Sequence, residues 1–360
     1  MTNRRSFLKQ AVGAVAATLQ PLGASKARGA TGLHRRRIGF AQTVLGPLDT
    51  YKLGFTLTHE HIADGPYVLN RWPKSWGGRA EFVAKAVETL EAIKAAGVAT
   101  VVDLTTYDVA RDIRFLQEVS RKSGVNMIAS TGQRFFPPRF PDVSMPSRTV
   151  AGLTKFFIKE IEQGIDDTGT KAGVIKIGII AKAPTDLEEI GLRAAARASK
   201  ATGVPIRIHT DAANRAGESQ AAILEQEGVK PARVSFDHSD DSGDMDYFLG
   251  LARRGYSLSM DHVHRGIDPK FKPSFDKRLE CIKLLIDAGF ADKLFLSQDS
   301  EIGGSLLPVE VKEWRETIDP PDGLLFVTRK LIPHLRDLGV GYGDIRKITL
   351  ENPRRFFGRV

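Results

Sequence analysis

The sequence predicts a single (β/α)8 TIM barrel with an N-terminal hairpin extension. Eight β-like runs alternate with helical patterns along the chain, and this alternation is typical of parallel α/β folds. Eight such units are the number that closes a barrel, and the length left after the first 30 residues fits one domain of this kind. We therefore expect two parts, a signal peptide over residues 1–30 and the barrel over residues 31–360.

The first 30 residues have the form of a twin-arginine export signal. Arg4 and Arg5 precede Phe7, and a mildly apolar run over residues 11–22 is followed by small residues up to Ala30. That run is shorter than the roughly 20 strongly apolar residues that span a bilayer. It predicts export by the twin-arginine machinery to the periplasm, or to the periplasmic side of the membrane. A basic disordered tail is the alternative.

The composition excludes several other classes of protein. A hydrophobic content of 42% with 26% charged residues is typical of a globular chain rather than a disordered or membrane protein. The formal charge is +9, but five of these positive charges lie before Ala30 and the signs are mixed thereafter. No nucleic-acid partner is therefore expected. The single cysteine, Cys281, excludes an internal disulfide framework.

The elements of the barrel follow in order along the chain. Residues 38–53 hold a Gly46-Pro47 turn between two short runs, which predicts a hairpin that caps the barrel. Strands are predicted over residues 54–61, 99–106, 126–132, 172–180, 205–210, 233–240, 256–262 and 294–300. Amphipathic helices are predicted over residues 80–96, 112–123, 187–202, 217–227, 244–254, 276–288 and 320–338.

Ionisable side chains gather where these strands end, and a barrel of this type carries its active site at that end. His59 and His61 end the first strand, and the period of two along a strand turns both imidazoles into the barrel. The other strand-end residues are His209, His238 and His262 on strands five to seven and Asp299 on strand eight. One such histidine alone would be a hydrogen-bonded core residue, but the whole set needs a cation to satisfy it. The sequence thus predicts a metal site.

Two buried cations complicate this site. Lys176 on the fourth strand would repel a metal as an ammonium group, whereas a carbamate formed with carbon dioxide would make it a carboxylate-like bridge. The alternative is a core lysine whose amine reaches the barrel rim. Arg207 also faces the interior when strand alternation is counted from His209, and it needs an acidic partner that the sequence does not identify.

Six segments together resemble the bacterial phosphotriesterase (aryldialkylphosphatase) family of the amidohydrolase superfamily. The resemblance runs from about residue 38 to the end of the chain. The segments are GFTLTHEH at 54–61, AGVIK at 172–176, VPIRIHT at 204–210, HSDD at 238–241, DH at 261–262 and SQD at 297–299. No single segment is specific, but the combination is.

The resemblance implies a binuclear centre that holds two divalent metal ions, expected to be zinc, with cobalt or manganese as alternatives. The implied ligands are His59, His61 and Asp299 for the buried ion, His209 and His238 for the more exposed ion, and a carbamate on Lys176 as the bridge. A hydroxide shared by the two ions would be the nucleophile.

The resemblance also implies catalytic roles for Asp299, His262 and Asp241. Asp299 would accept the proton of the attacking water, and His262 would pass it to Asp241 and solvent. A surface acid with no role in catalysis is the alternative for Asp241.

Substrate contacts are expected from Arg134, Phe135 and Val109, and a solvated loop residue with no such contact is the alternative for Arg134. Arg134 takes the place of a pocket tryptophan of the family, and Ser300-Glu301 takes the place of a Trp-Leu pair. These changes predict a cleft more polar than an aromatic leaving group favours.

The leading prediction is hydrolysis of organophosphate triesters, and a lactone or carboxylic ester hydrolase with the same metals is the alternative. The short segment 264–275 resembles that of the related lactonases, although they carry Asp-Arg where this chain has Asp261-His262. A non-catalytic binding protein on the same barrel is the remote alternative. The expected partners are a small-molecule ester and, as in similar proteins, a second copy of the chain in a homodimer.

Overall fold

The computed structural model describes residues 39–63, 78–138, 144–302 and 321–359. The chain divides into two units, Met1–Arg37 and Ile38–Val360, and every described residue belongs to the second. The predicted twin-arginine signal at residues 1–30 lies outside the described residues and stays a prediction. None of the described helices combines the length and the apolar character needed to cross a membrane.

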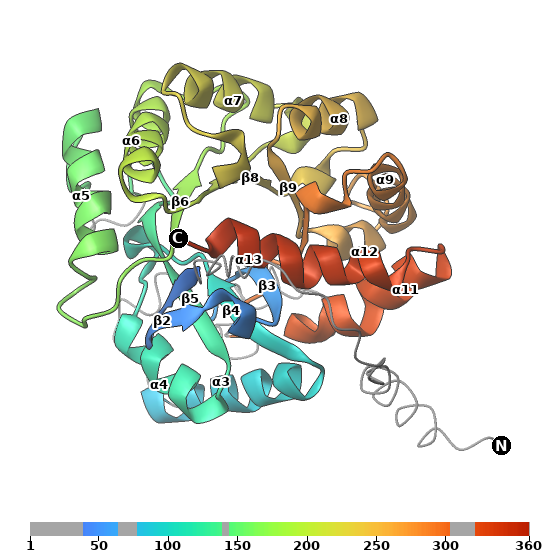
Figure 1. Ribbon diagram of the computed structural model, residues 1–360, viewed down its shortest axis with the longest axis horizontal. Coiled ribbons are helices and arrows are strands. Elements are labelled where there is room, and N and C mark those ends of the chain that lie inside the picture. The colour runs from blue at the N-terminus through green and yellow to red at the C-terminus, as the bar shows by residue number, and fades with distance from the viewer. Residues whose placement is uncertain (1–38, 64–77, 139–143, 303–320, 360) are drawn as a thin grey trace, which may run out of the picture. The chain divides into compact units, whose positions relative to one another are not determined.

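The predicted TIM barrel is confirmed. Eight parallel strands are hydrogen-bonded in chain order from β3 to β10, and helices lie around the outside of the strands (Figure 1). The strands are β3 (Phe55–Glu60), β4 (Val98–Asp103), β5 (Asn126–Gln133), β6 (Val174–Gly178), β7 (Ile206–His209), β8 (Val234–Asp237), β9 (Ser257–Met260) and β10 (Leu294–Leu296). The metal-ligand candidates were predicted at strand ends, and several of them follow directly after the last strand residue.

The barrel is nearly closed between β10 and β3 by contacts just beyond the two strands. The amide of His61 donates to the carbonyl of Ser300 at 3.0 Å, and the amide of Asp299 donates to the carbonyl of His59 at 3.1 Å. An isolated parallel bridge also joins His61 to Glu301. The residues at the ends of the first and the last barrel strand, 59–61 and 299–301, are thereby brought together at the site.

The buried side chain of Glu60 reinforces this closure. Its carboxylate accepts hydrogen bonds from Ser297 Oγ at 2.6 Å, Gln298 Nε2 at 3.0 Å and the Ser300 amide at 2.9 Å. Because buried carboxylates are costly unless their oxygens are bonded, these contacts fix the backbone after β10. Asp299 lies within that fixed segment.

The helices follow the strands as predicted, with two differences. The helices that cover the barrel are α3 (Gly78–Ala95), α4 (Ile113–Ser123), α5 (Val150–Glu162), α6 (Asp186–Thr202), α7 (Gly217–Gln226), α8 (Met245–Arg253) and α9 (Phe275–Asp287). No range was predicted for α5, whose Thr149 side chain caps it after a proline-rich stretch. In the predicted helix 320–338, Pro320 lies outside the described residues, and a π-helix, Val327–Leu331, precedes α11 (Ile332–Asp337).

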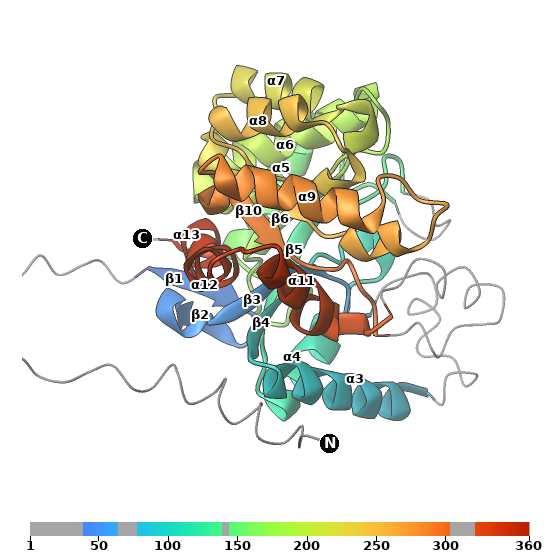
Figure 2. The same cartoon turned by 90° about the vertical axis from the view of Figure 1, so that its right-hand side faces the viewer.

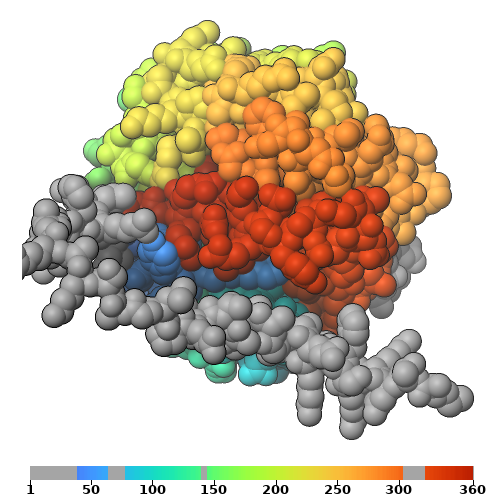
Figure 3. Space-filling model, turned by 45° about the vertical axis from the view of Figure 1, so that its right-hand side comes forward, coloured from blue at the N-terminus to red at the C-terminus, as the bar shows by residue number. Residues whose placement is uncertain are grey.

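The predicted hairpin is present as β1 (Phe40–Thr43) and β2 (Gly46–Asp49). Its first strand pairs with the chain end, since Phe40 and Arg359 exchange backbone hydrogen bonds of 2.9 and 2.8 Å. Two short helices, α12 (Tyr342–Arg346) and α13 (Asn352–Phe357), lie beside the hairpin in Figure 2, and the red band of Figure 3 runs from the hairpin to the α9 region. Phe356 and Phe357 pack with Phe295 in an apolar cluster that fills this end of the barrel, so the polar chemistry is confined to the other end.

Candidate metal centre

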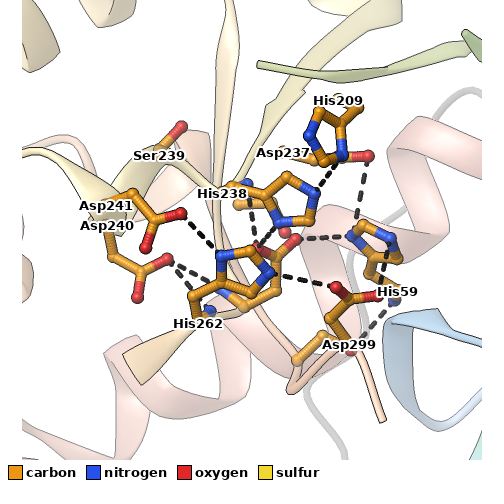
Figure 4. Close-up of polar contacts among 12 residues, drawn as sticks. His59, His209, Asp237, His238, Ser239, Asp240, Asp241, His262 and Asp299 are labelled. Carbon is orange, nitrogen blue, oxygen red and sulfur yellow. Dashed lines mark hydrogen bonds and ion pairs between the residues drawn. The ribbon is translucent and has the colours of Figure 1, made fainter. Parts of the chain in front are cut away.

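The three ligands predicted for the buried ion, His59, His61 and Asp299, converge at the carboxyl end of the barrel. Figure 4 shows two of them, His59 and Asp299, facing each other. His59 Nε2 lies 3.3 Å from Asp299 Oδ1, and His61 Nε2 lies 3.4 Å from the same oxygen. Both histidine side chains are almost completely buried. One carboxylate oxygen and two ring nitrogens therefore face a common point, and their facing atoms lie close enough to share one metal ion.

The pair predicted for the second ion lies beside the first three. His238 Nε2 is 2.8 Å from His209 Nδ1, and the two rings meet edge to face. The His238 ring is also 5.1 Å from the His59 ring, centroid to centroid. The structure thus brings together all five of the histidine and aspartate ligands expected from the sequence.

Two of these residues adopt a backbone conformation that costs energy. His238 has φ 58° and Asp299 has φ 46°, both in the left-handed region that residues with a side chain seldom occupy. Such conformations persist where the surrounding contacts impose them, and they are concentrated at functional sites. At both positions the turn lets a residue beyond the strand end direct its side chain into the cluster.

A buried carboxylate that the sequence analysis gave no role, Asp261, orients the histidines. Its Oδ2 is 2.6 Å from His59 Nδ1, and its Oδ1 is 2.9 Å from His238 Nδ1. The Nδ1 of His61 is similarly engaged by Thr105 Oγ1 at 2.9 Å. When Nδ1 of a neutral imidazole carries the proton, Nε2 keeps its lone pair. The Nε2 lone pairs of His59 and His61 and the Asp299 carboxylate then face one another, a set that fits a divalent cation.

The electrostatics of the site favour the metal-binding forms of these residues. Burial lowers the pKa of His59, His209 and His238 well below the usual value for histidine. These rings are therefore neutral at neutral pH, and a neutral imidazole is the form that binds metal. Burial raises the pKa of Asp299, but the nearby histidines outweigh burial and lower that pKa well below its ordinary range.

Lys176 lies next to this cluster and is fully buried. Its Nζ is 3.3 Å from His59 Nε2, and it forms a very short ion pair with Asp237 Oδ2. Gly132 makes room for this strand, because a Cβ at that position would lie 1.8 Å from the Lys176 carbonyl. Burial lowers the pKa of Lys176, although Asp237 opposes this change.

Asp237 is also the acidic partner that Arg207 lacked in the sequence analysis. Arg207 Nε donates to Asp237 Oδ1 at 2.6 Å, and Arg207 Nη2 donates to Ser259 Oγ at 2.8 Å. Arg207 and Asp237 are both completely buried. At the floor of the site, the buried carboxylate of Asp237 therefore pairs with two buried cations, Lys176 and Arg207.

The three residues predicted to relay protons are connected. His262 Nε2 is 3.0 Å from Asp299 Oδ2, and His262 Nδ1 is 2.7 Å from Asp241 Oδ2. Burial lowers the pKa of His262, but its bonds to the two carboxylates outweigh burial and raise that pKa to about 9. An imidazole held between two carboxylates can accept a proton on one side and release one on the other.

A cleft of about 340 Å³ opens beside His209, His238 and His262. Its lining includes Arg265 and Lys272, so this part of the site carries positive charge. The expected substrate contacts Arg134, Phe135 and Val109 are not among the lining residues. The amides of Arg134 and Phe135 are held by the Asp108 carboxylate at 3.0 and 2.8 Å, and Val109 is buried. Their role in binding substrate stays a prediction.

Comparison with known proteins agrees with this geometry. Residues 39–357 match the model of the phosphotriesterase family. The chain belongs to that family. It is 34% identical over 328 residues to a "phosphotriesterase homology protein" of Mycobacterium tuberculosis, covering 88% of this chain and 97% of the relative. The family is one of binuclear-metal enzymes, so the protein is a metal-dependent hydrolase.

Two further members of the family show a range of activities. An aryldialkylphosphatase of Saccharolobus solfataricus is 33% identical, over 86% of this chain and 96% of that protein. A solved structure, titled as the engineering of organophosphate hydrolysis from a weak promiscuous lactonase template, superimposes with a TM-score of 0.77 at 31% identity. It covers 89% of this chain and all of that one. Family membership thus identifies a hydrolase without identifying its substrate.

Proposed function

We propose that this member of the phosphotriesterase family hydrolyses organophosphate triesters. The observation that supports the proposal is the connected series Asp299, His262 and Asp241, with gaps of 3.0 and 2.7 Å. Related lactonases carry an arginine in place of His262, and an arginine cannot exchange a proton near neutral pH. This chain has kept a proton-conducting residue where those lactonases have a fixed charge.

The side chains described above fit two divalent cations, which we expect to be zinc, with cobalt or manganese as alternatives. When bound, such ions lower the pKa of a coordinated water and polarise the phosphoryl oxygen. We also propose that Lys176 reacts with carbon dioxide to form a carbamate, which would turn a repelling cation beside His59 into an anionic ligand.

The chain's own residues then handle the proton. Asp299 Oδ2 accepts it as the water oxygen attacks phosphorus. His262 receives it at Nε2 in its neutral form, protonated at Nδ1, which two bound cations would favour over the imidazolium. His262 releases its Nδ1 proton to Asp241, whose side chain is about one quarter exposed and so communicates with solvent. The bond from phosphorus to the leaving oxygen breaks as the new P–O bond forms, and the leaving group departs as an alkoxide or phenoxide that takes a proton from solvent. No covalent bond to the enzyme is needed.

A lactone or carboxylic ester is the second candidate substrate. The observation that favours it is the presence of two cations, Arg265 and Lys272, in the cleft lining, since a pocket for an aryl leaving group gains mainly from apolar side chains. The same metal centre and the same proton relay would serve a tetrahedral carbon centre.

A substrate panel distinguishes the two candidates. The protein is purified with divalent metal and bicarbonate, and kcat/KM is measured for a diethyl aryl phosphotriester, an acyl homoserine lactone and an aryl ester. We expect the triester to give the highest value, and we expect Asp299→Asn to lower it by at least about 100-fold because that variant lacks the proton acceptor. A lactone rate far above the triester rate would reject the triester assignment and leave the metal centre intact.

The metal model has its own test in Lys176→Ala. We expect two ions per chain in the wild type and fewer in the variant, because the bridge between the two sites is lost. Loading with ¹³C-bicarbonate should give the wild type one enriched carbon resonance that the variant lacks. Lys182→Ala, which removes an exposed lysine after β6, should change neither measurement. Full metal content and full activity in Lys176→Ala would show that the lysine is not a ligand.

A further inference from the structure

Helix α9 carries a buried guanidinium group, that of Arg278, directly behind the proton relay. Only 1% of this side chain is exposed. One nitrogen, Nη1, donates both to Asp240 Oδ2 at 2.9 Å and to Asp241 Oδ1 at 2.8 Å. Arg278 contacts neither the metal-ligand candidates nor any residue to which a catalytic role was assigned, apart from Asp241.

The two carboxylates that Arg278 joins hold His262 in two different ways. Asp241 Oδ2 is bonded to the imidazole at Nδ1, at 2.7 Å. Asp240 Oδ1 accepts the backbone amides of Asp261 and His262 at 3.0 and 3.1 Å. One carboxylate therefore sets the orientation of the ring, and the other fixes the backbone from which the ring projects.

Adjacent buried carboxylates are costly without a cation, because they lose hydration and repel each other. Burial raises the pKa of Asp241, yet His262 and Arg278 together hold that pKa well below its ordinary range. Without Arg278, the site would lose the charge that keeps both carboxylates in place as hydrogen-bond acceptors.

The remaining two nitrogens of the same guanidinium, Nε and Nη2, hold the segment that borders the cleft. Arg278 Nε donates to the Pro273 carbonyl at 2.9 Å, and Nη2 donates to the Lys272 carbonyl at 3.2 Å. Lys272 lines the cleft together with Arg265, Phe271 and Arg278 itself. A planar guanidinium can make these contacts and the carboxylate contacts at once, whereas an ammonium group presents a single charged point.

We propose that Arg278 is a positioning residue for the hydrolytic reaction, which holds the relay through Asp240 and Asp241 and the cleft wall through the carbonyls of residues 272 and 273. This inference rests on the proposed function, in which Asp241 receives the proton. It assigns two separable tasks to one side chain. The carboxylate contacts affect proton transfer and therefore kcat, and the carbonyl contacts affect the substrate-binding wall and therefore KM.

Three variants separate these tasks. Arg278→Met removes both sets of contacts, Arg278→Lys keeps a charge for the carboxylates but not the carbonyl contacts, and Lys277→Met is the matched control. Lys277 is the neighbouring cation, 42% exposed, and pairs only with Glu280 among the described residues. Each variant is measured with the substrate that the wild type hydrolyses fastest.

We expect Arg278→Met to lower kcat by roughly 10-fold or more, within the range that a positioned proton-transfer group contributes, and to raise KM. Arg278→Lys should recover kcat to within about threefold of the wild-type value, because proton transfer depends on a positive charge beside the carboxylates. KM should stay raised, because the cleft wall is held by the planar guanidinium, which an ammonium group does not replace. Lys277→Met should match the wild type. Equal kcat and KM in wild type and Arg278→Lys would overturn the assignment of the wall to Arg278.

A second measurement needs neither metal nor turnover. In metal-free protein labelled with ¹⁵N-histidine, the proton on His262 Nδ1 should give a protected resonance, assigned by its absence in His262→Asn. We expect Arg278→Lys to keep this resonance and Arg278→Met to lose it.

If Arg278→Met folds and keeps both the resonance and kcat, the positioning role is wrong. If the wild type hydrolyses no ester, the proposed function fails, and the resonance still decides the role of Arg278. If Arg278→Met does not fold, the kcat and KM of Arg278→Lys decide it.

Discussion

Replacement of Asp237 by asparagine should destabilise the folded protein by about 3–5 kcal/mol, the cost of leaving buried charges without their partner. Asp237 pairs with Lys176 and Arg207, and all three side chains are at most 2% exposed. An amide keeps the size of the side chain but cannot neutralise a cation. Lys176 could lose its proton to escape this cost, whereas an arginine in a protein cannot, so most of the destabilisation is expected through Arg207.

The measurement is equilibrium urea unfolding of the metal-free protein, with the midpoint and slope compared between the two chains. The matched control is Asp287→Asn, the same chemical change in a carboxylate that is 53% exposed and paired with Lys283. Exposed pairs contribute about 0–1 kcal/mol, so this control should unfold close to the wild type. A loss of less than about 1 kcal/mol in Asp237→Asn would mean that solvent, or Asp261, whose Oδ2 lies 3.6 Å from Arg207 Nη2, compensates for the lost charge.

Asp237 also shows why the sequence predicted the metal ligands but not the buried residues that surround and hold them. The ligands follow from strand ends, because parallel strands bring their carboxyl ends together. Counting alternation back from His238 turns Asp237 away from the interior. In the structure His238 lies beyond the end of β8 with a positive φ, so alternation fails there and both side chains face inward. The partner of Arg207 was therefore hidden by a local turn that no periodic pattern reveals.

The fold was predictable because it follows from periodic patterns, and the errors of the prediction are confined to individual helices. Strand patterns recur eight times along the sequence and helix patterns seven times, so an error in one unit leaves the count of strands intact. The helix over 150–162 was missed because a proline-rich stretch obscures its start, and the C-terminal helices 342–346 and 352–357 are too short for a clear pattern. The cleft was the least predictable part, since it depends on where the segment after β9 folds back.

Replacement of Asp261 by asparagine should disturb metal binding and leave the fold intact, and it should do so more cleanly than the loss of any one metal ligand. Asp261 accepts hydrogen bonds from His59 and His238, one from each predicted metal site, at 2.6 and 2.9 Å. The amide of asparagine offers one oxygen and one NH2 group, so one of the two histidines must face a donor. That ring would have to place its proton on Nε2, and it would lose the lone pair that binds metal.

We expect metal affinity at the disturbed site to fall by roughly 10–100-fold, the usual effect of losing a carboxylate that orients a ligand, and kcat/KM to fall with it. Ions per chain are counted after equilibration at a fixed, buffered concentration of free zinc, where the variant should retain about one ion fewer than the wild type. Asp211→Asn is the control, because Asp211 also lines the cleft but its side chain bonds only to Asn214 among the described residues. Equal metal content in Asp261→Asn and the wild type would show that the backbone alone orients the two histidines. A loss of both ions would instead indicate that the two sites load cooperatively, which is the behaviour expected if one bridge on Lys176 serves both.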